Sequence, residues 1–268
     1  MNPRSCPHDP RENGWERSAA AWITEQGERG DFGRREVLDP VMLPWALRGA
    51  PGRVLDVGCG EGRFCRLLQS HGIRAIGIDP TAKLLARARA LDPPGTYVEG
   101  RAEELPFDDS TFDLVVSYLS LIDIPRLEPA ITEMVRVLRP RGRLLIANLT
   151  SFTTARRDGG LWRRAFGWLL GAPVARYLEE HARWIDYRGI RVLNHHRPLA
   201  TYMRLLLAAG LELVDFDEPP PREGAPELRA ARYRRAPWFV VMEWRKATGD
   251  GGNGESADTV GDRVEFVP

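Results

Sequence analysis

Short apolar runs alternate with helical spacing through the middle of this chain. Runs typical of buried strands occur at residues 54–57, 75–79, 112–117 and 142–147. Apolar residues three and four apart predict helices at residues 64–68, 82–91 and 127–138. Strands that alternate with helices predict an α/β fold, in which a mostly parallel sheet lies between layers of helices.

Helical spacing also precedes this core. An amphipathic helix is predicted to begin at Trp15, and a second helical stretch at 36–47 is expected to be interrupted at Pro40 and Pro44. The C-terminal part contains a predicted helix and two strands, at residues 199–209, 211–216 and 238–244. An insertion at 151–197 separates this part from the fifth strand.

The insertion is predicted to fold as a small cap over the core. Residues 162–170 have helical spacing, and residues 183–193 predict two short strands around Gly189. Its aromatic residues either line an acceptor pocket or pack against the core: Trp162, Phe166, Trp168, Trp184 and Tyr187. The expected organisation is a tail at 1–13, one domain at 14–247 and a tail at 248–268, both tails being expected to be disordered. The domain divides into residues 14–49 (N-terminal helical cap), 50–150 (core), 151–197 (insertion) and 198–247 (C-terminal helix and strands).

Composition excludes several classes of protein. The net charge of +1, from 38 basic and 37 acidic residues, provides no overall attraction to nucleic acid or to an anionic membrane. No run of about 18 apolar residues and no apolar leader occurs, so a cytoplasmic location is expected. The cysteines Cys6, Cys59 and Cys65 lack the spacing of metal ligands, and no metal site is predicted.

Residues 53–64, Arg-Val-Leu-Asp-Val-Gly-Cys-Gly-Glu-Gly-Arg-Phe, carry the strongest chemical signal. Gly58, Gly60 and Gly62 join a buried strand to a helix, a layout that brings backbone N–H groups and a helix N-terminus against a ligand. Glycine suits such a turn because a Cβ would block the close approach. The dinucleotide fingerprint requires a further glycine where Arg63 stands, which disfavours an NAD-type oxidoreductase.

Val-Leu-Asp-Val-Gly-Cys-Gly-Glu-Gly resembles the first motif of class I S-adenosylmethionine (SAM)-dependent methyltransferases. Residues 75–79, 100–107 and 112–117 resemble later motifs of that family, in the family's order. The resemblance implies a Rossmann-like fold, with a seven-stranded, mostly parallel sheet of order 3-2-1-4-5-7-6. The last strand would be antiparallel, and SAM would be the cofactor.

The resemblance also implies which residues bind SAM. Asp79, followed by Pro80, would accept hydrogen bonds from the ribose hydroxyls, and Ala102 and Glu103 would lie beside the adenine. The implied cofactor-binding residues are Arg34, Asp56, Gly58, Gly60, Gly62, Asp79, Pro80, Ala102, Glu103 and Ser117.

Two of these assignments, and the role of Arg101, leave alternatives open. Asp56 either bonds backbone N–H groups or binds the amino end of SAM. Arg34 is a candidate partner of the SAM carboxylate, with Arg35 as its rival. Arg101 replaces an acid that is commoner in the family, so either it stacks on or skirts the adenine, or another group accepts from the base.

His195-His196-Arg197-Pro198-Leu199 resembles the C-terminal half of a bacterial subgroup that acts on small molecules. His196 precedes a helix N-terminus, whose dipole keeps a histidine neutral, and it is the candidate catalytic base. The alternative is that His196 only hydrogen-bonds the backbone.

The function expected is transfer of a methyl group from SAM to a small-molecule acceptor by in-line displacement. An RNA or protein methyltransferase is one alternative, because arginines between 222 and 235 can form a basic patch, although a nucleic-acid partner is not favoured. A SAM-binding module without catalysis is another. Oligomeric state and acceptor stay open.

Overall fold

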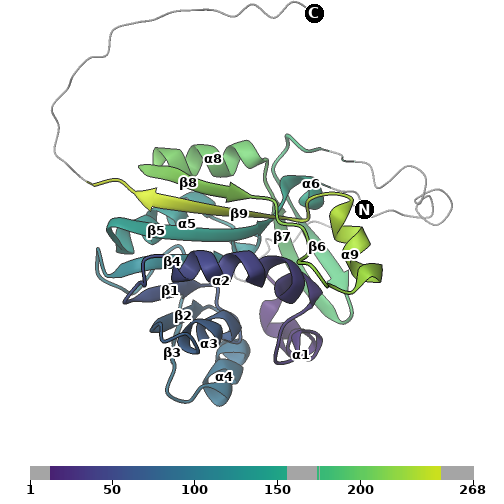
Figure 1. Ribbon diagram of the computed structural model, residues 1–268, viewed down its shortest axis with the longest axis horizontal. Coiled ribbons are helices and arrows are strands. Elements are labelled where there is room, and N and C mark those ends of the chain that lie inside the picture. The colour runs from purple at the N-terminus through teal and green to yellow at the C-terminus, as the bar shows by residue number, and fades with distance from the viewer. Residues whose placement is uncertain (1–12, 156–173, 175, 249–268) are drawn as a thin grey trace, which may run out of the picture.

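The computed structural model describes residues 13–155, 174 and 176–248 of the chain (Figure 1). Both predicted tails and the helical spacing at 162–170 therefore lie outside the described residues, except for residue 13 and residue 248. Among the described residues, no helix is both long and apolar enough to cross a membrane.

A seven-stranded sheet forms the centre of the fold, in the order β3-β2-β1-β4-β5-β9-β8. Its strands are β1 (Val54–Val57), β2 (Ala75–Asp79), β3 (Thr96–Glu99), β4 (Phe112–Tyr118), β5 (Leu138–Leu149), β8 (Leu211–Asp217) and β9 (Phe239–Lys246). The pairs from β3 to β5 are parallel, and β9 is antiparallel to both β5 and β8. This confirms the predicted fold class, strand order and antiparallel last strand.

Helices cover both faces of the sheet, and the central strand β1 is therefore buried on both sides. Val54 packs into the cluster of apolar side chains that includes α2 (Asp39–Leu47), α3 (Arg63–Gln69) and α4 (Ala82–Leu91). Leu55, one position later, faces the cluster with α5 (Leu127–Val137) and α8 (Leu199–Ala208). The alternation of side chains along a strand explains why a continuous apolar run marks a central strand.

The predicted interruption of the helix at Pro40 and Pro44 is wrong. A π-helix, η1 (Arg34–Leu38), continues directly into α2. Pro40 lies in the first turn of α2, where its missing N–H costs little, whereas Pro44 lies inside the helix. The buried side chains of Met42, Trp45 and Ala46 hold α2 against the sheet in spite of Pro44.

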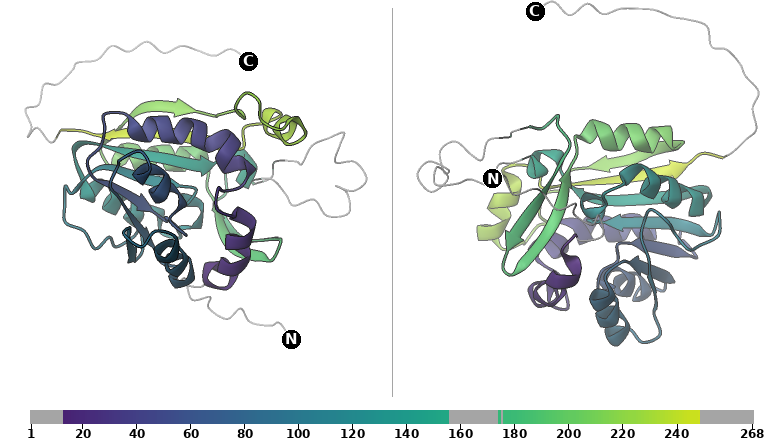
Figure 2. Two further views of the ribbon diagram at one scale, coloured as in Figure 1. Left: turned by 60° about the horizontal axis from the view of Figure 1, so that its bottom comes forward. Right: turned by 180° about the vertical axis from the view of Figure 1, so that it is seen from behind.

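A smaller layer covers one end of the sheet. The hairpin of β6 (His181–Tyr187) and β7 (Ile190–His196) turns at Arg188 and Gly189, which both have positive φ, and it confirms the strands predicted around Gly189. Helix α1 (Trp15–Gln26) lies beside β7, where Ser18 Oγ donates to the Arg191 carbonyl at 3.0 Å (Figure 2). Three further elements are not predicted by the sequence pattern. They are the short elements η2 (Leu121–Asp123) and α6 (Ser151–Thr154) and the helix α9 (Glu227–Arg234). We call α1, η1, the hairpin and α9 together the cap.

Candidate functional site

A cavity of about 1030 Å³ lies between the cap and the edge of the sheet where β1, β2 and β4 end. Ligands of open α/β sheets bind at this carboxyl edge. Eight predicted site residues line the cavity: Arg34, Gly58, Gly60, Asp79, Pro80, Ala102, Glu103 and His196. Asp56, Gly62 and Ser117 do not line it.

The glycine turn needs its glycines for different reasons. Gly58 has φ 77°, and a Cβ added to it would lie 2.3 Å from the Ser120 Cβ. Gly60 also has positive φ, but its nearest neighbour, the Leu84 Cδ1, would be 3.8 Å from an added Cβ. Gly62 faces the ring of Tyr97, 2.5 Å from where its Cβ would stand. Gly58 and Gly60 therefore bring backbone to the cavity, whereas Gly62 packs the turn against β3.

Asp79 connects the end of β2 to the glycine turn. Its Oδ2 accepts from the Gly60 N–H at 2.9 Å, and its Oδ1 accepts from the Thr81 N–H at 2.8 Å. Burial raises the pKa of Asp79, and these backbone hydrogen bonds oppose the rise. The Thr81 side chain also hydrogen-bonds this carboxylate, and the remaining acceptor capacity is available to a ligand hydroxyl.

Asp56 and Ser117 lie beneath the cavity. Asp56 is 1% exposed, and its Oδ1 accepts no hydrogen bond from the described residues. The Cys65 Sγ lies 3.5 Å from the Asp56 Oδ2. Ser117 Oγ lies 2.7 Å from Ser120 Oγ, which donates to the Val57 carbonyl at 2.6 Å. Asp56 is thus a buried acceptor with unused capacity, and Ser117 supports the segment that covers Gly58.

The buried carboxyl of Asp56 is expected to make the fold less stable as pH rises from about 4 to 7. Burial raises the pKa of this carboxyl from 3.8 to about 7, so the folded chain binds the proton more tightly than the unfolded chain. The free energy of unfolding should therefore fall as pH rises from about 4 to 7 and level off above that. The gain in stability from Asp56→Asn should be about 2 kcal/mol or more larger at pH 8 than near pH 4. Urea denaturation of both proteins at both pH values measures this difference. An equal gain in stability at the two pH values would contradict the raised pKa of Asp56.

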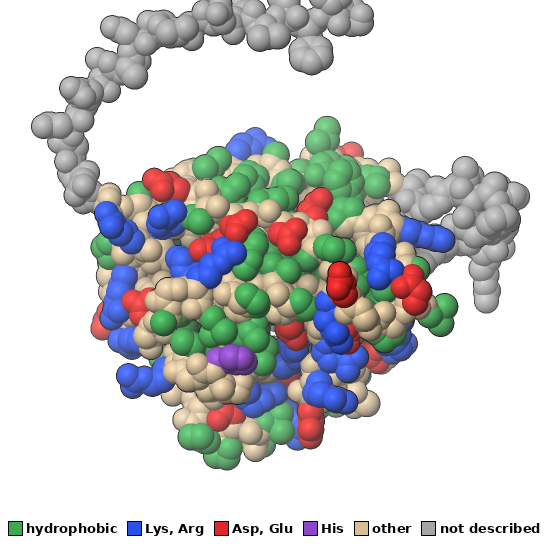
Figure 3. All heavy atoms as spheres, viewed as in Figure 1, with side chains coloured by type: hydrophobic (Ala, Val, Ile, Leu, Met, Phe, Trp, Pro, Cys, Tyr) green, Lys and Arg blue, Asp and Glu red, His purple; other side chains and the backbone are tan. Residues whose placement is uncertain are grey.

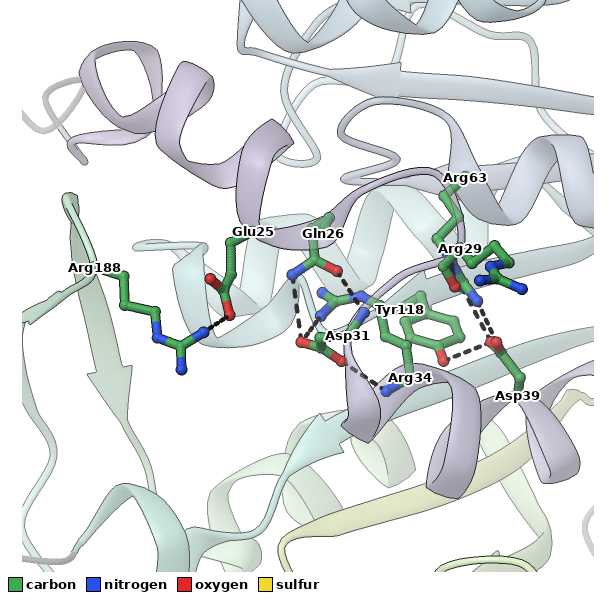
Figure 4. Close-up of polar contacts among 9 residues, drawn as sticks. All are labelled: Glu25, Gln26, Arg29, Asp31, Arg34, Asp39, Arg63, Tyr118 and Arg188. Carbon is green, nitrogen blue, oxygen red and sulfur yellow. Dashed lines mark hydrogen bonds and ion pairs between the residues drawn. The ribbon is translucent and has the colours of Figure 1, made fainter. Parts of the chain in front are cut away.

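Arg34, and not Arg35, lines the cavity. Figure 4 shows Arg34 beside Asp31. Asp31 holds it in place, because Asp31 Oδ1 accepts from the Arg34 N–H at 2.8 Å and Oδ2 from its Nη1 at 2.9 Å. The Arg34 guanidinium carbon lies 4.9 Å from the centroid of the Trp22 ring. Arg35 instead lies beside Glu36, at 3.8 Å. The one-turn π-helix thus places neighbouring arginines in different environments.

Arg63, which stands where the dinucleotide fingerprint has glycine, connects the glycine turn to the N-terminal part of the chain. Its guanidinium forms an ion pair with Asp39 and donates to the Arg29 carbonyl at 2.9 Å (Figure 4). The Tyr118 hydroxyl donates to the same Asp39 at 3.0 Å. Sequence reasoning missed Tyr118, although it is the residue that ends a strand at the carboxyl edge.

Arg101 lines the cavity beside Ala102 and Glu103. Its guanidinium pairs with Glu103, at 3.2 Å between Nη2 and Oε1. The Glu103 side chain is almost fully buried, whereas that of Arg101 is about one third exposed. Arg101 therefore neutralises a buried acid at the cavity wall.

His196 is 2% exposed and both of its ring nitrogens have partners. Nε2 lies 2.9 Å from the Tyr177 carbonyl, which can only accept, so Nε2 carries the proton. Nδ1 then accepts from the Thr154 hydroxyl, at 2.7 Å. Burial lowers the pKa of His196, which keeps it neutral at physiological pH. Its Nδ1 can take a proton only when the Thr154 hydroxyl turns away, towards the Ser151 carbonyl at 3.3 Å.

Several cavity residues carried no sequence signal. The cavity is also lined from α1, η2, β7, α9 and the segment just before β9, by Trp22, Asp123, Asn194, Tyr233 and Trp238 respectively. Of the insertion aromatics, Tyr187 lines the cavity, Trp184 contacts Arg191, and Trp162, Phe166 and Trp168 lie outside the described residues. Residues that converge from separate elements leave no spacing pattern in the sequence.

Comparison with known proteins identifies the family. A sequence-family model described as "Methyltransferase domain" matches residues 55–146. The chain is 32% identical to a malonyl-[acyl-carrier protein] O-methyltransferase of Erwinia billingiae, over 63% of this chain and 62% of that protein. It is 32% identical to a demethylmenaquinone methyltransferase of Beutenbergia cavernae, over 60% of this chain and 69% of that protein. The match thus spans less than two thirds of the malonyl-[acyl-carrier protein] enzyme.

Solved structures share the architecture. A SAM-dependent methyltransferase of Mesorhizobium loti superimposes with a TM-score of 0.63 and 28% identity, over 72% of this chain and 90% of that one. The cavity also suits SAM. Asp79 lines it with acceptor capacity to spare, and Gly58 brings the backbone to it because no side chain fits there. The motifs, the sheet order and these relatives agree, and the chain belongs to the class I SAM-dependent methyltransferases.

Proposed function

We propose that this chain transfers the methyl group of SAM to a small-molecule acceptor bound between the core and the cap. The observation that supports this best is the shared cavity, which Gly58, Gly60 and Asp79 line from the core and Trp22 and Tyr187 from the cap. Bound SAM supplies a methyl group on a positively charged sulfur, which a lone pair of the acceptor displaces in line.

In this proposal the chain's residues hold SAM along the edge of the sheet. Asp79 accepts from the ribose hydroxyls, and Ala102 and Glu103 flank the adenine. Arg34 binds the carboxylate through its guanidinium, which Asp31 already orients at 2.9 Å. For the amino group of SAM, the candidate partner is the Oδ1 of Asp56, a buried acceptor to which no described residue donates.

Rate acceleration would come mainly from positioning. Aromatic side chains line the cavity from the cap and from β4, including Trp22, Tyr118, Tyr233 and Trp238. They exclude water and restrict the acceptor next to the methyl group, an effect worth up to ~7–11 kcal/mol.

The cavity rim favours an acceptor that combines an apolar body with a negative charge. Arg232 and Arg235 line the cavity beside Tyr233 and Trp238. The relatives named above act on a malonyl-[acyl-carrier protein] and on demethylmenaquinone. An acyl thioester panel and a quinol panel are therefore the first acceptors to assay.

An RNA substrate is less favoured, because arginines of the 222–235 segment have local acidic partners. Arg222 lies 2.7 Å from Glu36, and Arg234 lies 2.7 Å from Glu227. On the face seen in Figure 3, basic and acidic side chains are interspersed. Binding to tRNA that weakens steeply with salt would favour the RNA alternative.

Ligand binding tests the proposal directly. S-adenosylhomocysteine (SAH) at 100 times its Kd should stabilise the fold by about 2.7 kcal/mol, seen as a rise in Tm. NAD should leave Tm unchanged. Stabilisation by NAD and not by SAH would overturn the proposal, and SAH binding without turnover on either panel would favour a binding module.

His196 remains the proposed base, and His196→Asn tests it. If Nδ1 takes the proton, the turnover rate should fall by about 10²-fold or more while SAH affinity stays unchanged. Thr154→Val is the companion variant, since it frees Nδ1 and should not reduce turnover in the same way. Retained turnover in His196→Asn would leave His196 with a structural role between α6 and the Tyr177 carbonyl.

A further inference from the structure

Asp123 lies at the point where the cap meets the core, and no role above uses it. It ends η2, the short turn after β4, and lines the cavity. Asn194 on β7 donates through Nδ2 to the Asp123 Oδ1, at 2.6 Å. The side chain of Trp15, at the start of α1, also hydrogen-bonds the carboxylate. Two separate cap elements thus direct their donors at one core carboxylate.

The turn that carries Asp123 is held in place from both sides. The buried Arg197 donates to the carbonyls of Leu121 and Ile124, at 3.2 and 2.7 Å, and to that of Pro125, at 3.0 Å. Ser120 bonds the Val57 carbonyl and packs against Gly58. The Asp123 carboxylate is therefore held in a defined position relative to the glycine turn.

Two side chains proposed to bind SAM, those of Asp79 and Arg34, act electrostatically on Asp123. Burial raises the pKa of Asp123 to about 7, hydrogen bonds from Asn194 and Trp15 oppose this, Asp79 raises it further and Arg34 lowers it. In SAM, the sulfonium lies between the ribose, assigned to Asp79, and the carboxylate, assigned to Arg34.

We infer that Asp123 faces the sulfonium of bound SAM and makes the cavity prefer the cationic donor over the neutral product SAH. The inference rests on the proposed function, since it needs SAM in this cavity. Loss of the positive charge on transfer removes the attraction to Asp123, which assists exchange of SAH for SAM. Asp123 is thus a specificity-determining residue for the charge state of the cofactor.

The charge and titration of neighbouring groups determine how the pH dependence must be measured. Asp79 and Arg34 act on the charge of Asp123, and the charged Arg197 holds the same turn through the carbonyls of Leu121 and Ile124. On β7, burial lowers the pKa of His195 to about 4 and lowers that of His196, so both are neutral above about pH 6.5. Burial also raises the pKa of Asp56, to about 7, and that of Asp79, so the Asp123 variant must be compared with wild type at every pH.

The experiment is isothermal titration of the full chain with SAM and with SAH from pH 6 to 8.5. In wild type, the ratio of Kd for SAH to Kd for SAM should rise about 5-fold over this range, with a midpoint between about pH 6 and 7. This is most of the roughly 10-fold change that follows if the sulfonium lowers the pKa of Asp123 by one unit. In Asp123→Asn the ratio should stay nearly flat. Asp186→Asn is the matched control, because Asp186 lines the same cavity but pairs with Arg191 at 3.1 Å; it should behave as wild type.

Asn194→Ala keeps Asp123 and removes a donor that stabilises its ionised form, so the midpoint should move to higher pH. If Asp123→Asn does not fold, the pH dependence of Asn194→Ala tests the inference in its place. A ratio that rises in Asp123→Asn as it does in wild type, or an unmoved midpoint in Asn194→Ala, would overturn the inference. Failure of wild type to bind either ligand would instead overturn the proposed function.

Discussion

Asp79→Ala is expected to weaken SAH binding by roughly 1.5–3 kcal/mol, about 10- to 150-fold in Kd. The carboxylate is proposed to accept from the ribose hydroxyls, and it also accepts the Gly60 and Thr81 N–H groups. The variant therefore loses direct contacts and loosens the glycine turn. Isothermal titration calorimetry on the folded variant measures the loss.

Asp113→Ala is the matched control. Asp113 Oδ2 also accepts two backbone N–H groups, those of Gly52 and Arg53, at 3.0 and 2.9 Å, but these lie before β1, at the opposite edge of the sheet. Removal of its carboxylate should lower the free energy of unfolding and leave SAH affinity within about twofold of wild type. Unchanged affinity in a folded Asp79→Ala variant would remove Asp79 from the ribose role.

Gly58→Ala is expected to cost about 2–4 kcal/mol of stability and to abolish tight SAH binding. Part of the cost is the left-handed backbone, and the larger part is the 2.3 Å approach of the new Cβ to the Ser120 Cβ. Relief of that contact must displace the turn that carries Ser120 and Asp123. Thermal and urea unfolding measure the stability, and calorimetry measures the binding.

Gly72→Ala separates the two contributions. Gly72 has φ 79°, close to the 77° of Gly58, and nothing lies within 4 Å of an added Cβ. It should cost only about 1–2 kcal/mol. Ser120→Gly should partly rescue Gly58→Ala, because the next Ser120 atom, its Cα, is 3.7 Å away. Equal costs for Gly58→Ala and Gly72→Ala would show that the Ser120 contact is relieved without penalty.

The sequence by itself determined the sheet and the position of the ligand edge. A buried run such as Val54–Val57 leaves few conformations other than a central strand, and the glycines after it fix where backbone approaches a ligand. The strand that ends in Asp79 is predictable for the same reason: local pattern and motif spacing act over neighbouring residues. The strand order followed from resemblance to the family and agrees with the structure.

Only the tertiary structure decided what the cap side chains do. The packing of η1 decides that Arg34, and not Arg35, lines the cavity. The partners of His196 are Thr154 and the Tyr177 carbonyl, which are distant in sequence. Asp123 becomes a chemical group of interest because Asn194, 71 residues later, donates to it. Such contacts form when separate elements pack, and neither period nor composition records them. The same packing kept α2 intact through Pro44, where its buried side chains offset the local preference of proline to end a helix.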